Sequence, residues 1–247
     1  MNNQKIAIAE DNEHLGQIIS GVNPIQKNVD VNINKTRKCL FSLMGCPFSH
    51  NSQVNPAVQH ETWVIYASPI LRSGLQSLVI QLHSASMKSL ETFQRKVMRG
   101  FLGFSSRSPI PGLHFLLGEL PVAGQIHWDC LSLLWSIWTN PASLCHKVVK
   151  YLLVHAADNS RTWSLYNQQI SRMHCLPDPI QLLELMPPSK ESWKISCDAL
   201  KYAFHERQLR TSAETNSRMT RLNIQLQSLH SCHPLLQNVT SPREVQK

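Results

Sequence analysis

Apolar residues recur along most of this 247-residue chain at intervals of three and four, the spacing of helices that pack one face on a core. The pattern is clearest between Ser84 and Phe104, where Ser84 suits a helix N-cap and Gly103 suits a helix end. The apolar stripe of this stretch consists of Met87, Leu90, Phe93, Val97, Phe101 and Phe104. Similar patterns predict helices over 29–45, 56–67, 121–140, 142–156, 161–174, 179–186, 191–208 and 212–229, and a short one between Pro109 and Gly118. Pro69 should kink or break the helical stretch around it.

Strand signals are confined to the start of the chain. Residues 4–9 and 14–19 are short apolar runs on either side of the polar stretch Glu10–Glu13, which predicts a β-hairpin with its turn at 10–13. We therefore expect a mainly α fold, with a short N-terminal β-hairpin followed by a helical bundle and further helices.

Composition indicates a globular protein with an intracellular address. Hydrophobic residues make up 42% of the chain, and no apolar run approaches the roughly 18 residues that a membrane span needs. The first residues lack the basic start and apolar block of a signal peptide or mitochondrial leader. We expect a protein of the cytoplasm or nucleus that is not secreted and has no membrane partner. Its seven cysteines, an odd number without CxxC spacing, predict reduced thiols.

The positive charge is concentrated in one third of the chain. Residues 31–110 carry nine Lys or Arg and two acidic residues, a local balance of 9 − 2 = +7 within a total of +8. Such a concentration suggests a polyanion partner, because Lys and Arg that neutralise phosphates release condensed counterions. The alternative is a solvated helix face, and composition alone leaves both open.

The residue patterns that accompany catalysis are missing. The sequence has no GxxxxGK[ST], GxGxxG or GxSxG motif, and Asp11-Asn12 lacks the second Asp of a metal-binding pair. His230, Cys232 and His233 are too close together to ligate one zinc ion, and no CxxC or HxxxH completes the set. We therefore predict no catalytic residues, no metal ligands, no cofactor and no enzymatic activity for the chain as given.

Several short phrases, in one order along the chain, resemble the polyprotein of non-LTR, LINE-type retrotransposons in the region after the reverse transcriptase active site. The phrases are HLGQIISG (14–21), KTRKCLFSLMG (35–45), NPAVQHETWVIYASPILRSGLQSL (55–78), LETFQRKVMRGFLGF (90–104), HFLLGELPV (114–122), NSRTW (159–163), LPDP (176–179), PPSKESWK (187–194) and NSRM (216–219), with a later HP (233–234). Together they span nearly the whole chain.

The resemblance implies a fragment of an RNA-directed DNA polymerase that holds the template–primer duplex. His14, Leu15 and Gly16 match the phrase that grips the primer, a helical thumb follows, and the catalytic palm with its divalent metal site is missing, so the chain alone would not polymerise. The implied segments are a palm and primer-grip remnant (1–24), a thumb-like domain (25–108), a following helical region (109–230) and a flexible tail (231–247). The partners would be RNA and DNA duplex phosphates and, in the intact polyprotein, the palm.

A thumb of this kind needs helices with an apolar stripe on one side and basic residues on the other, contacting phosphates without reading bases. The candidate nucleic-acid-binding residues are Lys35, Arg37, Lys38, Lys88, Arg95, Lys96 and Arg99. Tryptophans could stack on bases as well, but five of the six fall within apolar stripes or tight junctions, so we expect core packing. The alternatives are a helical protein-interaction module, with exposed apolar surface where the palm docked, and a relic without function.

Overall fold

The computed structural model describes residues 11–14, 17–44, 54–155, 162–184, 188–222, 229, 231–236, 238–239 and 245. Two short antiparallel strands come first, β1 (Asp11–His14) and β2 (Gln17–Ser20). The α-helices are α1 (Pro24–Met44), α2 (Pro56–Thr62), α3 (Ser68–Arg72), α4 (Ala85–Leu102), α5 (Ile110–Leu117), α6 (Val122–Trp138), α7 (Leu144–His155), α8 (Trp163–Met173), α9 (Pro179–Glu184), α10 (Lys190–Glu214) and α11 (Ser217–Leu222). A π-helical turn, η1 (Trp63–Ala67), and two 3₁₀ turns, η2 (Leu75–Ser77) and η3 (Pro234–Leu236), complete the list. The predicted fold class, mainly α with an N-terminal hairpin, is confirmed.

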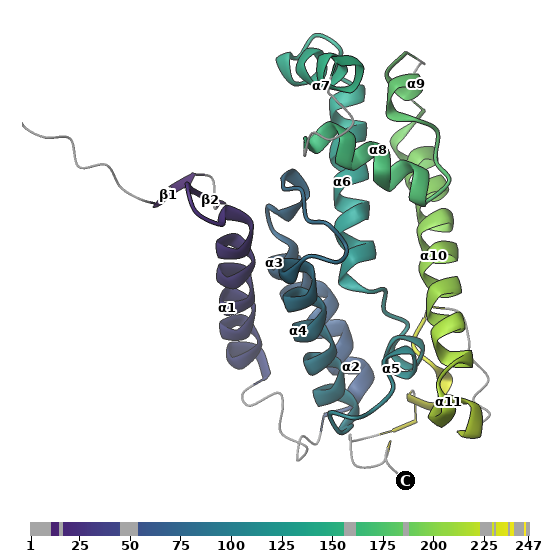
Figure 1. Cartoon of the computed structure of the whole chain (residues 1–247). Helices are drawn as coiled ribbons and strands as arrows, with labels where there is room; N and C mark the ends of the chain where they lie inside the picture. Colours follow the sequence, from purple (N-terminus) through teal and green to yellow (C-terminus); the bar gives the residue numbers. More distant parts are fainter. Residues whose placement is uncertain are drawn as a thin grey trace, which may run out of the picture.

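The long helices lie side by side, with shorter helices at both ends (Figure 1). Helix α1 packs on α3 and α4, α4 also contacts α6, and α6 packs on α10. Helices α7, α8 and α9 gather at one end of α6, while α5 and α11 lie toward the other end (Figure 1). No helix in the described ranges combines the length and the apolar character that crossing a membrane requires.

The hairpin pairs in a different register from the predicted one. Asp11 pairs with Ser20 and His14 with Gln17, so residues 11–13 belong to a strand and not to a turn at 10–13. The polar residues expected in the turn form β1, where Asn12 to His14 are exposed. An antiparallel strand with one face toward solvent tolerates such polar residues.

A buried asparagine connects the hairpin to α1. Asn28 accepts a hydrogen bond from the Ile18 backbone N–H at 2.8 Å and donates from Nδ2 to the carbonyls of Ile18 and Pro24, each at 2.8 Å. The Asn28 side chain therefore bonds both the N–H and the C=O of Ile18, as a neighbouring strand would.

The stretch from Pro56 to Arg72 stays helical through Pro69, where the sequence predicts a kink or break. A π-helical turn precedes the proline, and the Ser68 N–H bonds the carbonyl of Trp63, five residues earlier. Proline cannot donate a hydrogen bond and its ring crowds the carbonyl four residues before it. A local π turn accommodates such a residue without ending the helix.

Helix α4 follows its prediction closely. The Ser84 side chain accepts a hydrogen bond from the Met87 N–H at 3.2 Å, and Gly103 ends the helix in the left-handed conformation with φ of 66°. The predicted stripe is buried from Met87 to Phe101 and joins the main core with residues of α1, α6, α8 and α10. Three tryptophans are fully buried in this core and the other three are half-buried, in line with the packing expectation: Trp63, Trp138 and Trp193, and Trp128, Trp135 and Trp163.

The two C-terminal helices meet later than predicted. Helix α10 runs on to Glu214, and α11 begins at Ser217, whereas the sequence patterns placed the junction at 209–211. Asn216 explains the position, because its Oδ1 accepts hydrogen bonds from the N–H groups of Arg218 and Met219 and so caps α11.

Candidate nucleic-acid interface

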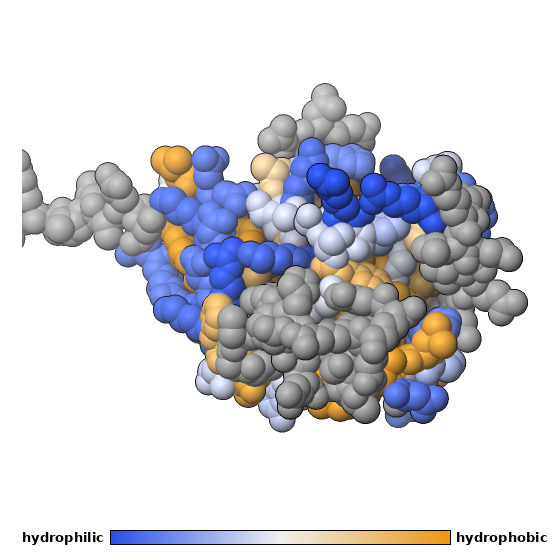
Figure 2. Space-filling model, turned by 90° about the horizontal axis from the view of Figure 1, so that it is seen from below, coloured by the Kyte–Doolittle hydropathy of each residue, from blue (hydrophilic) through white to orange (hydrophobic). Residues whose placement is uncertain are grey.

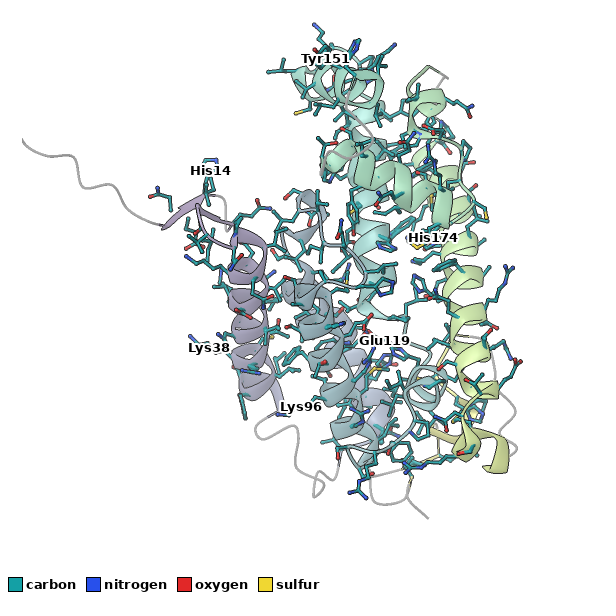
Figure 3. All side chains as sticks on the ribbon, viewed as in Figure 1. His14, Lys38, Lys96, Glu119, Tyr151 and His174 are labelled. Carbon is teal, nitrogen blue, oxygen red and sulfur yellow. The ribbon has the colours of Figure 1, made fainter. Side chains whose placement is uncertain are left out.

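Three of the predicted basic residues line one groove between α1 and α4. Its volume is about 640 Å³, and we call it the α1–α4 groove. Helix α1 contributes Asp30, Ile33, Asn34 and Arg37, and α4 contributes Lys88, Ser89, Thr92, Phe93 and Lys96. Each set repeats at intervals of three and four residues, so it lies along one face of its helix. In Figure 3, Lys96 lies toward α1, and the α1 side of the molecule is largely hydrophilic in Figure 2.

Arg37 is held at the wall of this groove. Its guanidinium lies 5.6 Å from the centre of the Phe93 ring, and Nη1 donates to Asn34 Oδ1 at 3.3 Å. Phe93 itself is only 5% exposed, so the aromatic ring is part of the core that supports the groove. Stacking on a ring leaves the guanidinium donors directed sideways, where an oxyanion can accept them.

Lys35 and Lys38 belong to other faces of α1. One residue advances a helix by about 100°, which turns Lys38 away from the groove face that contains Arg37. Figure 3 shows Lys38 on the outer side of α1. Lys35 lies on the side of the hairpin, where its Nζ is 3.6 Å from Glu13 Oε1 and both side chains are more than half exposed.

Arg95 and Arg99 are engaged within the fold. Arg95 donates to Glu91 Oε2 at 2.6 Å, one helical turn earlier, and lines a smaller pocket of about 230 Å³ shared with residues of α5 and α10. Arg99 Nη2 lies 3.4 Å from the carbonyl oxygen of Ser108, and burial together with the charge of Arg95 lowers the pKa of Arg99. The seven predicted residues therefore do not line one surface.

The predicted primer-grip residues are only partly described. His14 ends β1, opposite Gln17, and is exposed. Leu15 and Gly16 lie outside the described residues. Figure 3 shows His14 on the hairpin, beside the N-terminal end of α1.

Sequence reasoning missed the polar residues that share the α1–α4 groove with the basic ones. Asn34, Ser89 and Thr92 line it and offer donors of the kind that contact phosphates. Asn34 is three residues from Arg37, and Ser89 and Thr92 are one and four residues from Lys88. Helical spacing from the basic residues could therefore have identified them. The acidic Asp30 also lines the groove, where its Oδ1 accepts a hydrogen bond from Gln26 at 2.9 Å.

A second pocket, of about 480 Å³, adjoins a buried ion pair. His60 Nε2 contacts Glu119 Oε2, and His60 Nδ1 lies 3.5 Å from Cys232 Sγ. Burial alone would lower the pKa of His60, but its contacts with Cys232 and Glu119 raise it to about 9. Cys232 thus lies beside a histidine from α2, while the backbone N–H of His233 bonds the Leu116 carbonyl at 2.8 Å. His230, the third member of the cluster rejected as a zinc site, lies outside the described residues.

No protein-family model matches the chain. No curated protein and no solved structure matches it either.

Proposed function

We propose that the chain binds a nucleic-acid duplex through its phosphate backbone in the α1–α4 groove. The observation that carries the proposal is the convergence of Arg37, Lys88 and Lys96 from two helices on one groove, together with neutral donors. Arg and Lys bind phosphates as charge-assisted donors, and Ser, Thr and Asn side chains add contacts without reading sequence.

The spacing of the basic groups suits a polymeric anion. Lys88 and Lys96 are separated by eight residues of α4, or about 12 Å along the helix axis, so they would contact different phosphates. Arg37 faces them from α1 and can offer two parallel N–H donors to one phosphate. A small anion would occupy only part of such a site, whereas a nucleic-acid strand would contact all three residues.

The kind of duplex that we propose follows from the resemblance to LINE-type reverse transcriptases. On this proposal the chain is part of an RNA-directed DNA polymerase and holds an RNA–DNA template–primer duplex, while a palm outside this sequence would perform the polymerisation. Within the chain given, the proposed role is binding and not catalysis.

The test is a fluorescence-anisotropy titration of the full chain with a labelled RNA–DNA duplex at a series of salt concentrations. The groove variant replaces Arg37, Lys88 and Lys96 by Gln. The control variant replaces Lys147, Lys150 and Lys194 by Gln, which removes the same charge from exposed positions on α7 and α10. We expect the groove variant to reduce the slope of log affinity against log salt by about 3, and the control to leave it nearly unchanged. Equal slopes for the two variants would refute the groove as the binding site.

An exposed apolar face favours a second candidate, the helical interaction module. Helix α7 presents Leu144, Val148, Tyr151 and Val154, which are 75%, 46%, 63% and 55% exposed. Figure 3 shows Tyr151 on α7 at one end of the bundle. Such a stripe is typical of a helix that packs on another protein surface. This candidate expects no salt-dependent duplex binding in the same titration.

A further inference from the structure

Three histidines that are far apart in sequence meet inside the bundle. His127 lies on α6, His174 follows α8 directly, and His205 lies on α10. Each offers one ligand atom, and these three atoms all lie within 4.8 Å of one another. The ring centres are 5.4, 5.6 and 6.2 Å apart. Figure 3 shows His174 between α6 and α10.

These rings are buried without a full set of hydrogen bonds. The three residues are 1%, 2% and 3% exposed. His127 Nδ1 and His174 Nε2 are 3.2 Å apart. In the part of the chain that the structure describes, His127 Nε2, His174 Nδ1 and His205 Nε2 have no hydrogen-bond partner. Buried polar atoms are nearly always paired, so three unpaired nitrogens in one cluster indicate a bound group that they can serve.

Helix α8, which ends just before His174, carries further buried oxygens. Asn167 Oδ1 and Ser171 Oγ are buried and, within the described residues, have no partner. Positions 167 and 171 are four residues apart and share one face of α8. His174 follows Ser171 by three residues, at the end of the helix, so the Ser171 oxygen is the nearer of the two along the chain.

Gly124 leaves room for the His205 ring beside α6. A Cβ atom added at Gly124 would lie 2.6 Å from both Cδ2 and Nε2 of the His205 ring. Gly124 precedes His127 by three residues, so it lies on the same face of α6. Only glycine at this position allows the His205 ring to approach α6 beside His127.

The environment keeps the imidazoles neutral. Burial lowers the pKa of His127 well below its ordinary value, and burial with the charge of Lys201 lowers the pKa of His174 to about 4. Burial and the neighbouring histidines lower the pKa of His205 to about 3. Neutral imidazole is the form that binds metals. The positive charge of Lys201 is offset by Asp198, whose Oδ1 lies 2.8 Å from Nζ.

We propose that His127, His174 and His205 bind one zinc ion that joins α6, α10 and the end of α8. Imidazole nitrogen is a preferred zinc ligand, and three histidines leave one tetrahedral position for an oxygen, from water or from a side chain of α8. Tetrahedral ligands at the usual zinc–nitrogen distance are about 3.4 Å apart, so small side-chain rotations bring these atoms to ligand spacing. The buried position of the cluster between these segments suits an ion that holds them together. This proposal is independent of nucleic-acid binding.

X-ray absorption spectroscopy of the zinc-loaded full chain tests the ligand set without any substitution. We expect one zinc ion per chain, surrounded by nitrogen and oxygen at about 2.0 to 2.1 Å with the outer-shell scattering of imidazole. Sulfur at about 2.3 Å would overturn the proposal, because it would assign the metal to a cysteine such as Cys232. Absence of tight zinc binding would overturn it as well.

Variants then identify the ligands. In calorimetric titrations of chelator-treated protein with zinc, His127→Gln, His174→Gln and His205→Gln should each lose more than the roughly 10- to 100-fold in affinity typical of changes around a metal site. Gly124→Ala should weaken binding without removing a ligand, because it displaces the His205 ring. The matched control is His146→Gln, another buried histidine, which lies outside the cluster and contacts the Ile137 carbonyl at 3.3 Å. Equal affinity in the cluster variants and the control would refute the site.

Discussion

The carboxylate of Glu119 accepts a hydrogen bond from the indole Nε1 of Trp63 at 2.9 Å, inside the core. The same carboxylate contacts His60 and accepts hydrogen bonds from Gln94 at 3.2 Å and Gln125 at 2.8 Å. One buried charge therefore connects α2 and η1 with α4 and α6. Because removing a partner would leave a buried charge uncompensated, this group makes the stability of the fold sensitive to protonation.

We expect stability to fall as the pH rises from neutral to about 9. The pKa of His60 is raised from 6.5 to about 9 in the folded chain. Its contribution is therefore complete below 6.5 and is lost as the pH passes through about 9. A rise of this size corresponds to about 3 kcal/mol. Urea unfolding at pH 6, 7, 8 and 9 measures the loss.

Stability should also fall at low pH, because of Glu119. Burial would raise the pKa of Glu119, but the hydrogen bonds and charge of His60, with those of Trp63 and Gln125, lower it below its ordinary value. Its contribution is present above the ordinary carboxyl pKa and disappears as the pH falls through the lowered one. The control for the alkaline loss is Glu119→Gln, which removes one of the two contacts, with Cys232 and with Glu119, that raise the pKa of His60, and it should therefore reduce the alkaline loss. An unchanged alkaline profile in that variant would show that the ion pair is not its cause.

Gly118→Ala should destabilise the chain by more than about 2 kcal/mol. Gly118 has φ of 66°, and an added Cβ would lie 2.3 Å from the backbone of Ser231, which crosses it. Backbone atoms cannot rotate away as a side chain can, so the C-terminal segment would have to move. Gly21→Ala is the control, because no atom lies within 4 Å of a Cβ there. Thermal unfolding of the two variants compares the costs, and equal melting temperatures would contradict the close approach.

Local patterns predicted α4 because all its determinants lie within the helix: an N-cap serine, an apolar stripe and a glycine end. The π turn before Pro69 could not be predicted, since packing of Trp63 and Ala67 in the core decides whether the chain breaks or continues. The α10–α11 junction was predictable in principle, because Asn216 is a strong N-cap residue. The apolar spacing extends across that junction and concealed it.

The candidate site shows the same division between local and tertiary information. The concentration of basic charge was visible in the sequence, but the separation of Lys96 from Arg95 depends on which neighbouring helix each side chain meets. The three clustered histidines are separated by 47 and 31 positions. Spacing rules for metal sites detect ligands within one loop or helix, so a set assembled from two helices and the residue after a third leaves no motif.

Asn28→Asp should loosen the hairpin from α1. An aspartate retains the acceptor for the Ile18 N–H, but it loses both donors and places a carboxylate oxygen against the carbonyls of Ile18 and Pro24. The cost should be about 1 to 3 kcal/mol, and hydrogen exchange of the β2 amides should become faster. Asn34→Asp, at an exposed position of the same helix, is the control. Protection of β2 that is unchanged in Asn28→Asp would show that the hairpin is held by other contacts.

Basic residues of α4 line two different pockets, so their loss should affect duplex binding differently. Lys88→Gln and Arg95→Gln remove the same charge from positions two helical turns apart. Lys88 lines the α1–α4 groove, so its loss should reduce the salt slope of duplex binding by about 1. Arg95 is bonded to Glu91 and lines the pocket beside α5 and α10, so its loss should change the slope by less than half that amount. Anisotropy titrations at several salt concentrations measure both slopes. A larger effect of Arg95→Gln would place the duplex at the pocket that Arg95 shares with α5 and α10, because only a phosphate bound there would draw Arg95 away from Glu91.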